Sequence, residues 1–170
     1  MRRRNWMHGW ATITLVVLLS MLAGCDNQAI RELEEGVATE ADVRARFGQP
    51  ENVWDVPGVA GSRVFEYNRQ PQGQKNYMIT IGPDGKMSAL RQVLTPENFA
   101  KVQAGMPMEA MRKLLGKPAK VTPYALRRET EWEWRWVQPP NSPMVFTAVL
   151  NDDQRVVRSG SSPDRGTEAP

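Results

Sequence analysis

The spacing of hydrophobic and polar residues changes from a helical to a strand period twice along the chain. Residues 39–47 and 107–115 place apolar side chains three or four positions apart, which predicts amphipathic helices. Residues 76–81 and 131–136 then alternate strictly between apolar and polar side chains, as half-buried β-strands do. Turn sequences follow each of these strands, so we expect each to return as an antiparallel hairpin.

A further short helix is expected ahead of each of these two. Ile30–Glu35 is followed by Gly36, a residue that commonly ends a helix, and Thr95-Pro96 is a typical helix start. The predicted fold class is therefore α+β, with two tandem units of helix, helix and antiparallel meander.

The two predicted units are similar in sequence, which supports a duplication. Gly116 follows Gly48 by 68 positions, and each glycine lies two residues before a proline. Phe65-Glu66-Tyr67 matches Trp132-Glu133-Trp134 at a spacing of 67. We place the units at residues 25–94 and 95–158, and expect residues 159–170, rich in Ser, Gly, Pro and charge, to be a disordered tail.

The N-terminal residues have the pattern of an export signal. Arg2-Arg3-Arg4 precedes the apolar stretch Ile13–Leu22, as in a secretory signal peptide. Leu22-Ala23-Gly24-Cys25 then resembles the lipobox of bacterial lipoproteins. The resemblance implies that residues 1–24 are a signal peptide and that Cys25 carries a lipid anchor to a membrane.

The composition of the chain from Cys25 onward excludes several kinds of partner and catalytic site. Removing residues 1–24 takes away three arginines and no acid, so the 22 basic and 19 acidic residues become 19 of each. A nucleic-acid partner is not expected, because the required basic surface is missing. His8, the sole histidine, lies in the predicted signal, and Cys25 is the sole cysteine. This excludes Ser-His-Asp and Cys-His catalysis and Cys/His zinc sites, so we expect no cofactor, and an enzyme could use only carboxylate chemistry.

Several motifs of the second unit resemble the SmpA/OmlA (BamE-like) lipoprotein family. They are Gly105-Met106, Glu109, Leu114-Leu115-Gly116-Lys117-Pro118 and the strand with Trp132 and Trp134. The resemblance implies a role in outer-membrane protein assembly. Two units in tandem are also similar to secreted β-lactamase inhibitor proteins, which implies the alternative of a tethered inhibitor of a periplasmic enzyme.

Aromatic and charged residues supply the candidates for a binding surface. Trp132, Trp134 and Trp136 share one strand face, which is either a ligand-binding ladder or, as we favour, core. The partner-binding candidates include two loop aromatics, Trp54 beside Gly58 and Gly61, which we favour as an exposed anchor, and Tyr124, the second choice. The others lie on the opposite strand face: Glu131, Glu133 and Arg135.

The sequence thus predicts a lipid-anchored, periplasm-facing protein-binding module that is not an enzyme. The protein partners are unknown, with outer-membrane assembly components one possibility. The membrane is undecided, because Asp26 directly after Cys25 resembles an inner-membrane retention signal, whereas the family resemblance favours the outer membrane.

Overall fold

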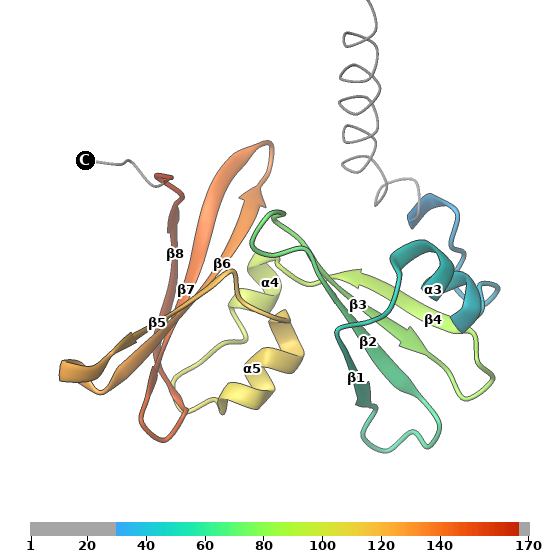
Figure 1. The fold of residues 1–170 in the computed structure, drawn as a ribbon, viewed down its shortest axis with the longest axis horizontal. Helices are drawn as coiled ribbons and strands as arrows, with labels where there is room; N and C mark the ends of the chain where they lie inside the picture. The colour runs from blue at the N-terminus through green and yellow to red at the C-terminus, as the bar shows by residue number, and fades with distance from the viewer. Residues whose placement is uncertain (1–29, 167–170) are drawn as a thin grey trace, which may run out of the picture.

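The computed structural model describes residues 30–166, which form two four-stranded antiparallel sheets with helices packed beside them (Figure 1). The predicted α+β class is confirmed. The predicted signal peptide, with the lipobox candidates Leu22, Ala23 and Gly24, lies outside the described residues, as do the predicted lipidation site Cys25 and the predicted sorting residue Asp26. Within residues 30–166, no helix has the length and apolar character needed to cross a membrane.

The first sheet follows helix α3 (Glu40–Phe47), which begins at a capping box. Asp42 N–H donates to Thr39 Oγ1 over 3.2 Å, while the Asp42 carboxylate accepts from Thr39 N–H over 2.9 Å. Helix α3 buries Val43 and Phe47 against the sheet. The strand order follows the chain: β1 (Asn52–Asp55), β2 (Arg63–Asn68), β3 (Asn76–Ile81) and β4 (Met87–Gln92).

The second sheet follows helices α4 (Pro96–Phe99) and α5 (Met108–Leu115). Its strands again follow chain order, with a short 3-10 helix, η1 (Ala125–Arg127), between the first two: β5 (Lys120–Tyr124), β6 (Glu129–Gln138), β7 (Ser142–Asn151) and β8 (Val156–Pro163). Trp134 and Trp136 are buried with Phe99 and Phe146, and Trp132 packs against the same cluster. The tryptophan face is therefore core, as expected, and is not a binding ladder.

The same tertiary contacts recur in both sheets. Tyr67 Oη donates to Gly48 O over 3.0 Å, and Trp134 Nε1 donates to Gly116 O over 3.1 Å. In each case an aromatic side chain of the second strand binds the carbonyl that ends the preceding helix. The sequence repeat is thus visible in equivalent hydrogen bonds.

Two predicted segments differ from the structure. Only Ile30 and Arg31 of the expected Ile30–Glu35 helix are helical, because the chain turns to follow β4, where Gly36 N–H donates to Met87 O over 2.7 Å. The expected disordered tail is wrong over Ser159–Pro163, which pairs with Met144–Ala148 as the second half of β8. Backbone pairing with β7 suffices there, because a strand at a sheet edge needs few buried side chains.

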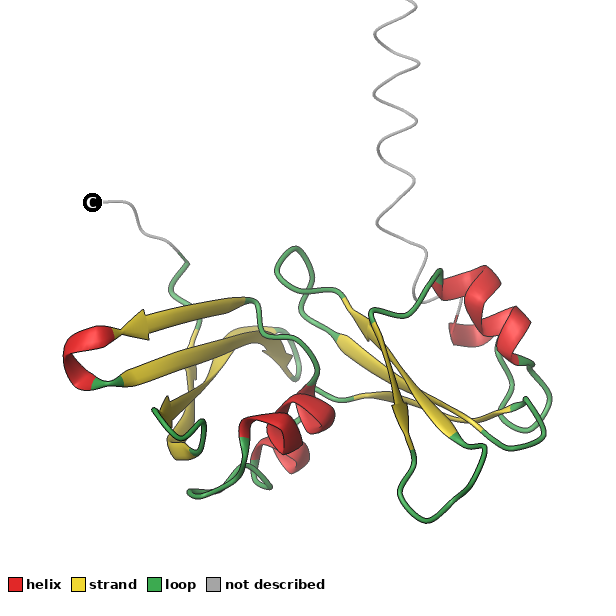
Figure 2. Ribbon diagram, turned by 60° about the horizontal axis from the view of Figure 1, so that its bottom comes forward, coloured by secondary structure: helices red, strands yellow, loops and turns green. Residues whose placement is uncertain are grey.

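The two sheets are joined by the helices of the second half. Helix α3 covers one face of the first sheet, and α4 and α5 lie between its other face and the second sheet in both ribbon views (Figures 1 and 2). Asn76 on β3 donates to Leu115 O at the end of α5 over 2.8 Å. The second sheet consequently has one face on these helices and the opposite face without a covering element.

Candidate functional site

The uncovered face of the second sheet, here called the outer face, collects four of the five predicted binding residues. The odd-numbered residues of β6 point to it, since Trp134 and Trp136 point to the core. Cross-strand pairing places neighbours from the other strands beside them: Lys120, Thr122, Tyr124, Glu129, Glu131, Glu133, Arg135, Val145, Thr147, Val149 and Arg158. Tyr124, Glu131, Glu133 and Arg135 therefore share one surface.

Most charges on the outer face are neutralised within the chain. Arg158 holds the Glu129 carboxylate through two hydrogen bonds of 2.6 and 2.8 Å, and these bonds lower the pKa of Glu129 below its usual value. Arg135 Nε donates to Asp164 Oδ2 over 3.0 Å. The Asp164 carboxylate also accepts from Gly166 N–H, and the two contacts lower its pKa.

Glu131, at the centre of the outer face, is the exception. Lys120 Nζ lies 3.7 Å from the Glu133 carboxylate, but no ion pair within 4 Å involves Glu131 in the described part of the chain. Its neighbours across the strands are Thr122 and Val149. Val149 is buried, and Thr122 Oγ1 is buried without a hydrogen-bond partner among residues 30–166. The Glu131 carboxylate thus lies beside a buried hydroxyl and a buried apolar side chain.

Tyr124 marks the end of the outer face but is not an exposed anchor. It is half-buried, and the Arg127 guanidinium lies 4.1 Å from its ring centroid. The exposed apolar side chain at this hairpin is Leu126 in η1, at 103% relative exposure. Sequence reasoning missed Leu126, because nothing in Ala125-Leu126-Arg127 distinguishes an exposed leucine from a buried one.

Trp54 lies apart from the outer face, and its prediction as an exposed anchor is wrong. The indole is half-buried where the two sheets' units meet. Its Nε1 donates to Glu66 Oε2 over 3.2 Å, and Lys113 Nζ lies 5.1 Å from the ring centroid. The loop after Trp54, with Gly58 and Gly61, suggested an exposed position, but α5 packs close to β1, the strand that contains Trp54.

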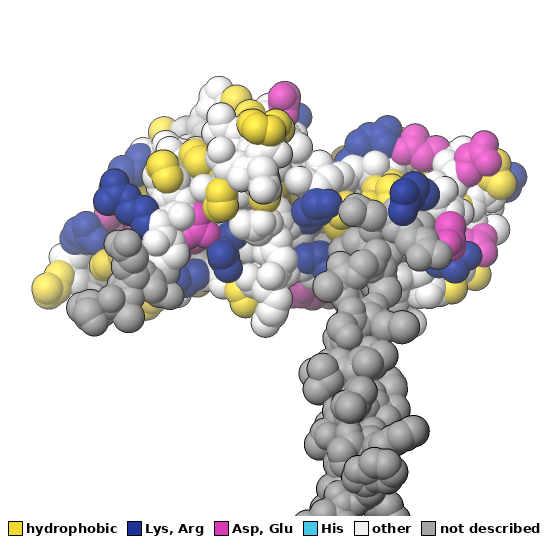
Figure 3. All heavy atoms as spheres, turned by 90° about the horizontal axis from the view of Figure 1, so that it is seen from above, with side chains coloured by type: hydrophobic (Ala, Val, Ile, Leu, Met, Phe, Trp, Pro, Cys, Tyr) yellow, Lys and Arg dark blue, Asp and Glu magenta, His cyan; other side chains and the backbone are white. Residues whose placement is uncertain are grey.

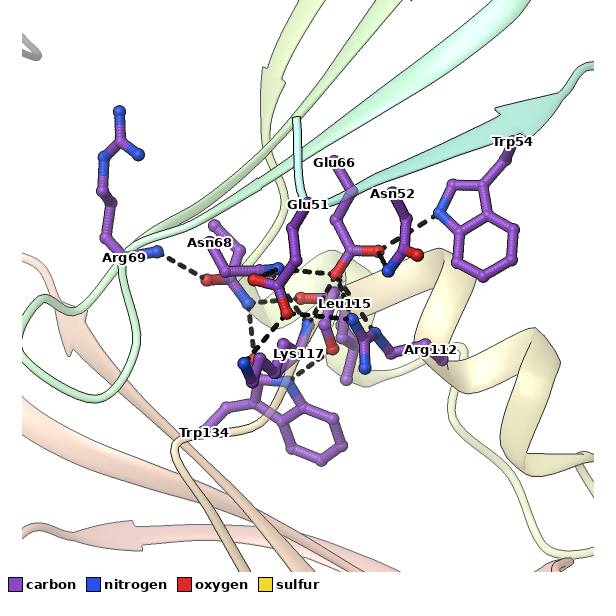
Figure 4. Close-up of polar contacts among 12 residues, drawn as sticks. Glu51, Asn52, Trp54, Glu66, Asn68, Arg69, Arg112, Leu115, Lys117 and Trp134 are labelled. Atoms are coloured by element: carbon purple, nitrogen blue, oxygen red, sulfur yellow. Dashed lines mark hydrogen bonds and ion pairs between the residues drawn. The ribbon is translucent and has the colours of Figure 1, made fainter. Parts of the chain in front are cut away.

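The contact between the two units is organised around a fully buried carboxylate, Glu66 (Figure 4). Arg112 of α5 donates to its Oε1 from Nε and Nη2, over 3.1 and 2.8 Å. The remaining donors are side-chain or backbone nitrogens 2.7–3.2 Å away: Asn52 Nδ2, Trp54 Nε1, Asn68 Nδ2 and Lys117 N. Sequence reasoning missed Glu66, which occupies the same position in its strand as the partly exposed Glu133.

Because the two units are similar in sequence, the face of the first sheet that contacts α5 can be compared with the outer face of the second. Glu66 and Asn68 on β2 correspond to Glu133 and Arg135 on β6, at the spacing of 67 seen in the sequence. The face of the first sheet that holds Glu66 is thus the counterpart of the outer face. On the first sheet this face binds α5, and on the second sheet no described element covers it.

Viewed from above, side chains of both charge signs are interspersed on the surface, and the apolar ones are scattered between them (Figure 3). In residues 30–166, no group of three or more His, Cys, Asp or Glu side chains is placed to hold a metal ion.

Comparison with known proteins places the chain in no family. No family model matches it, and neither does any curated protein. Its likeness to the SmpA/OmlA family therefore rests on the sequence motifs.

Two solved structures show partial similarity. One is a DUF4309 family protein (YjgB) from Bacillus subtilis, with 22% identity over 77% of this chain and 82% of that chain and a TM-score of 0.28. The other is a candidate β-lactamase inhibitor protein from Streptococcus mutans, with 9% identity over 81% of this chain and 98% of that chain and a TM-score of 0.34. Scores in this range do not establish a shared fold.

Proposed function

We propose that this protein is a lipid-anchored protein-binding module of the cell envelope and that the outer face of its second sheet docks the partner. One observation carries the proposal: the corresponding face of the first sheet already serves as a protein contact surface, for α5. The geometry of that contact is specific, since Glu66 and Asn76 bind an arginine and a helix end.

The chemistry of the outer face indicates what the partner presents. Within residues 30–166, the Glu131 carboxylate of the outer face forms no ion pair, and it adjoins the buried Thr122 hydroxyl and Val149. A lysine or arginine of a partner protein complements this carboxylate. Leu126 at the nearby hairpin adds one exposed apolar contact.

The proposed lipid anchor at Cys25 holds the protein at a membrane, so the partner binds there. Residues 26–29 separate Cys25 from Ile30, and four extended residues reach roughly 14 Å. The folded part would then lie against the membrane surface. An assembly role is our first proposal for this module, and inhibition of a periplasmic enzyme is the second; an enzymatic role is not proposed.

Site-specific photocrosslinking in the full, membrane-bound chain tests the docking surface. A photoreactive residue at Thr147, half-buried on the outer face, should yield one defined adduct. Glu131→Lys should abolish the adduct, whereas Glu109→Lys on α5 should leave it unchanged. Absence of any adduct, or an adduct that persists in Glu131→Lys, would contradict the proposal. An adduct with a membrane-assembly subunit favours the first role, and one with a soluble enzyme favours the second.

Metabolic labelling with fatty acid tests the anchor separately. Label should appear on the native chain and be absent from Cys25→Ala. Membrane fractionation of the native chain beside Asp26→Ser then tests the sorting role of Asp26; a native protein wholly in the outer membrane, unchanged by the substitution, would show that Asp26 carries no sorting signal.

A further inference from the structure

Strand β8 presents a free edge at the end of the second sheet (Figure 1). Asp164 N–H donates to Pro143 O over 3.0 Å, which fixes the alternation of backbone groups along the strand. Residues 158, 160 and 162 point their N–H and C=O groups toward β7, so those of Ser159 and Ser161 point outward. Within residues 30–166, no group bonds to these outward N–H and C=O groups, and both residues are exposed.

The corresponding edge of the first sheet is closed by side chains. Leu90 on β4 pairs with Ile79 as Ser159 pairs with Ala148, 69 positions later in each strand. Leu90 N–H donates to Glu35 Oε1 over 2.9 Å, and Leu90 O accepts from Arg91 Nη1 over 2.8 Å. Glu35 and Arg91 also form an ion pair with each other. Side chains thus occupy both outward-facing groups of Leu90.

The second sheet lacks both blocking side chains. At the same spacing of 69, Glu35 and Arg91 correspond to Ala104 and Gly160. Neither of these can reach the edge, and Ser159 Oγ donates to Val102 O over 3.1 Å. An exposed strand edge without such protection is a template for pairing with another strand.

The β8 edge is self-complementary. When two copies of β8 lie antiparallel with Gly160 opposite Gly160, Ser159 of each copy faces Ser161 of the other. Both residues point outward, so the two pairs form four N–H···O bonds. Arg158 lies opposite Ser162 of the second copy and is already bound to Glu129 of its own chain, so no like charges meet directly. A Cβ added at Gly160 would meet no heavy atom within 4 Å, so the surroundings of this residue are open.

We propose that two copies of this chain pair through β8 and form a continuous eight-stranded sheet. The twofold axis passes between the two Gly160 residues, perpendicular to the sheet, and leaves both outer faces on the same side. The proposal does not depend on the lipid anchor or on the docking function of the outer face.

Disulfide trapping of the full chain in its membrane tests the register. Directly opposed residues in a non-hydrogen-bonded antiparallel pair have Cα atoms about 4.5 Å apart, which suits a disulfide. Gly160→Cys should therefore form a covalent dimer under mild oxidation. Ser162→Cys should not, because its counterpart lies about four residues along, roughly 13 Å away. Arg91→Cys on the closed edge is the matched negative control, and the native chain controls for Cys25.

A monomeric Gly160→Cys, or equal trapping of all three cysteine variants, would overturn the proposal. A second measurement is the mass of the detergent-solubilised chain by light scattering. Ser161→Pro removes an outward N–H that the fold does not use, so it should give a folded monomer whose Tm, unlike that of the native dimer, does not depend on protein concentration. The double variant Ala104→Glu/Gly160→Arg rebuilds the block seen on β4 and should also be monomeric. A native chain that is monomeric throughout the tens-of-micromolar range, or variants that remain dimeric, would refute β8 pairing.

Discussion

Residues that are equivalent in the repeat have acquired different environments, and Glu66 and Glu133 are the clearest case. Each lies between two aromatic residues on the second strand of its sheet. Glu66 is fully buried among donors, whereas the Glu133 side chain is 26% exposed beside Lys120. Local sequence could not separate them, because the difference comes from α5, which covers the Glu66 face of the first sheet, whereas no described element covers the Glu133 face of the second. The prediction that assigned the outer face to binding therefore overlooked its occupied counterpart.

Replacing each glutamate by alanine should expose this difference. Glu66→Ala removes the fully buried carboxylate and leaves the donors around it, including the 21% exposed Arg112, without their acceptor; losing one partner of such a contact costs about 3–5 kcal/mol of folding free energy. Glu133→Ala removes a half-exposed pair and should cost less than about 1 kcal/mol. Urea denaturation of both variants gives the comparison; similar losses would show that Glu66 is not the centre of the contact.

Glu51 offers a second test at a single residue, through pH. Burial opposes its ionisation, but hydrogen bonds from Asn68 and Lys117 outweigh that effect and hold the pKa of Glu51 below its usual value. The unfolded chain therefore takes up this proton at a higher pH than the folded chain. The stabilisation is complete above the usual glutamate pKa and is lost as pH falls through the lowered one.

Thermal unfolding between pH 7 and pH 3 measures this contribution. The native protein should lose more stability toward acid than Glu51→Gln, and the two curves should converge at the acid end. Parallel curves over the whole range would mean that Glu51 does not link folding to pH.

The elements themselves were predictable where a local signal sets their ends. Helix α3 begins at the Thr39–Asp42 box and ends at Gly48, and α5 ends at Gly116, as the sequence indicates. The alternation in β3 and β6 was likewise sufficient. Strand β8 was missed beyond residue 158, because composition indicates disorder there and only the neighbouring β7 makes the segment a strand. The first predicted helix failed for a similar reason, since its residues follow the edge of β4.

The hydrogen bond that joins Tyr67 of β2 to Gly48 at the end of α3 can be tested by substitution. Tyr67→Phe removes the hydrogen bond to Gly48 O but keeps the ring against Phe47, 5.2 Å between centroids. The loss should be about 0.5–1.5 kcal/mol, the net contribution of one such bond. Tyr124→Phe, at the surface hairpin, is the control and should lie within about 0.5 kcal/mol of the native protein. A Tyr67→Phe variant as stable as the native chain would argue against the bond.

At the scale of the whole molecule, the two halves of the described chain pack together through polar contacts, which the hydrophobic pattern of neither half predicts. Asn76 Nδ2 donates to Leu115 O and Lys117 O. The Gln70 side chain donates to Arg135 O and accepts from Arg135 N–H, on the part of β6 that β5 does not reach. The sequence predicted two units at residues 25–94 and 95–158, but strand β8 continues to Pro163. It could not predict their packing, because the polar residues involved also suit a solvent-exposed strand face.

The contact between the units can be tested by comparing alanine substitutions at Gly116 and at its counterpart Gly48. Both substitutions strain the backbone, but only the one at Gly116 also disturbs the contact. Both glycines adopt a glycine-only conformation, with φ/ψ of 75°/−169° and 82°/−157°, so alanine should cost about 1–3 kcal/mol at either position. A Cβ at Gly48 meets no atom within 4 Å, but one at Gly116 would lie 2.5 Å from Asn68 Oδ1 and 2.9 Å from Asn76 Nδ2. Gly116→Ala should therefore cost about 1–3 kcal/mol more than Gly48→Ala, the usual range for overpacking.

Because the added cost of Gly116→Ala falls on side chains that join the two units, it should also weaken their cooperativity. Urea unfolding followed by tryptophan fluorescence and by far-UV circular dichroism should coincide for the native chain and for Gly48→Ala, and separate for Gly116→Ala. Equal destabilisation by the two substitutions, with coincident transitions in both, would show that the units do not depend on the close approach at Gly116.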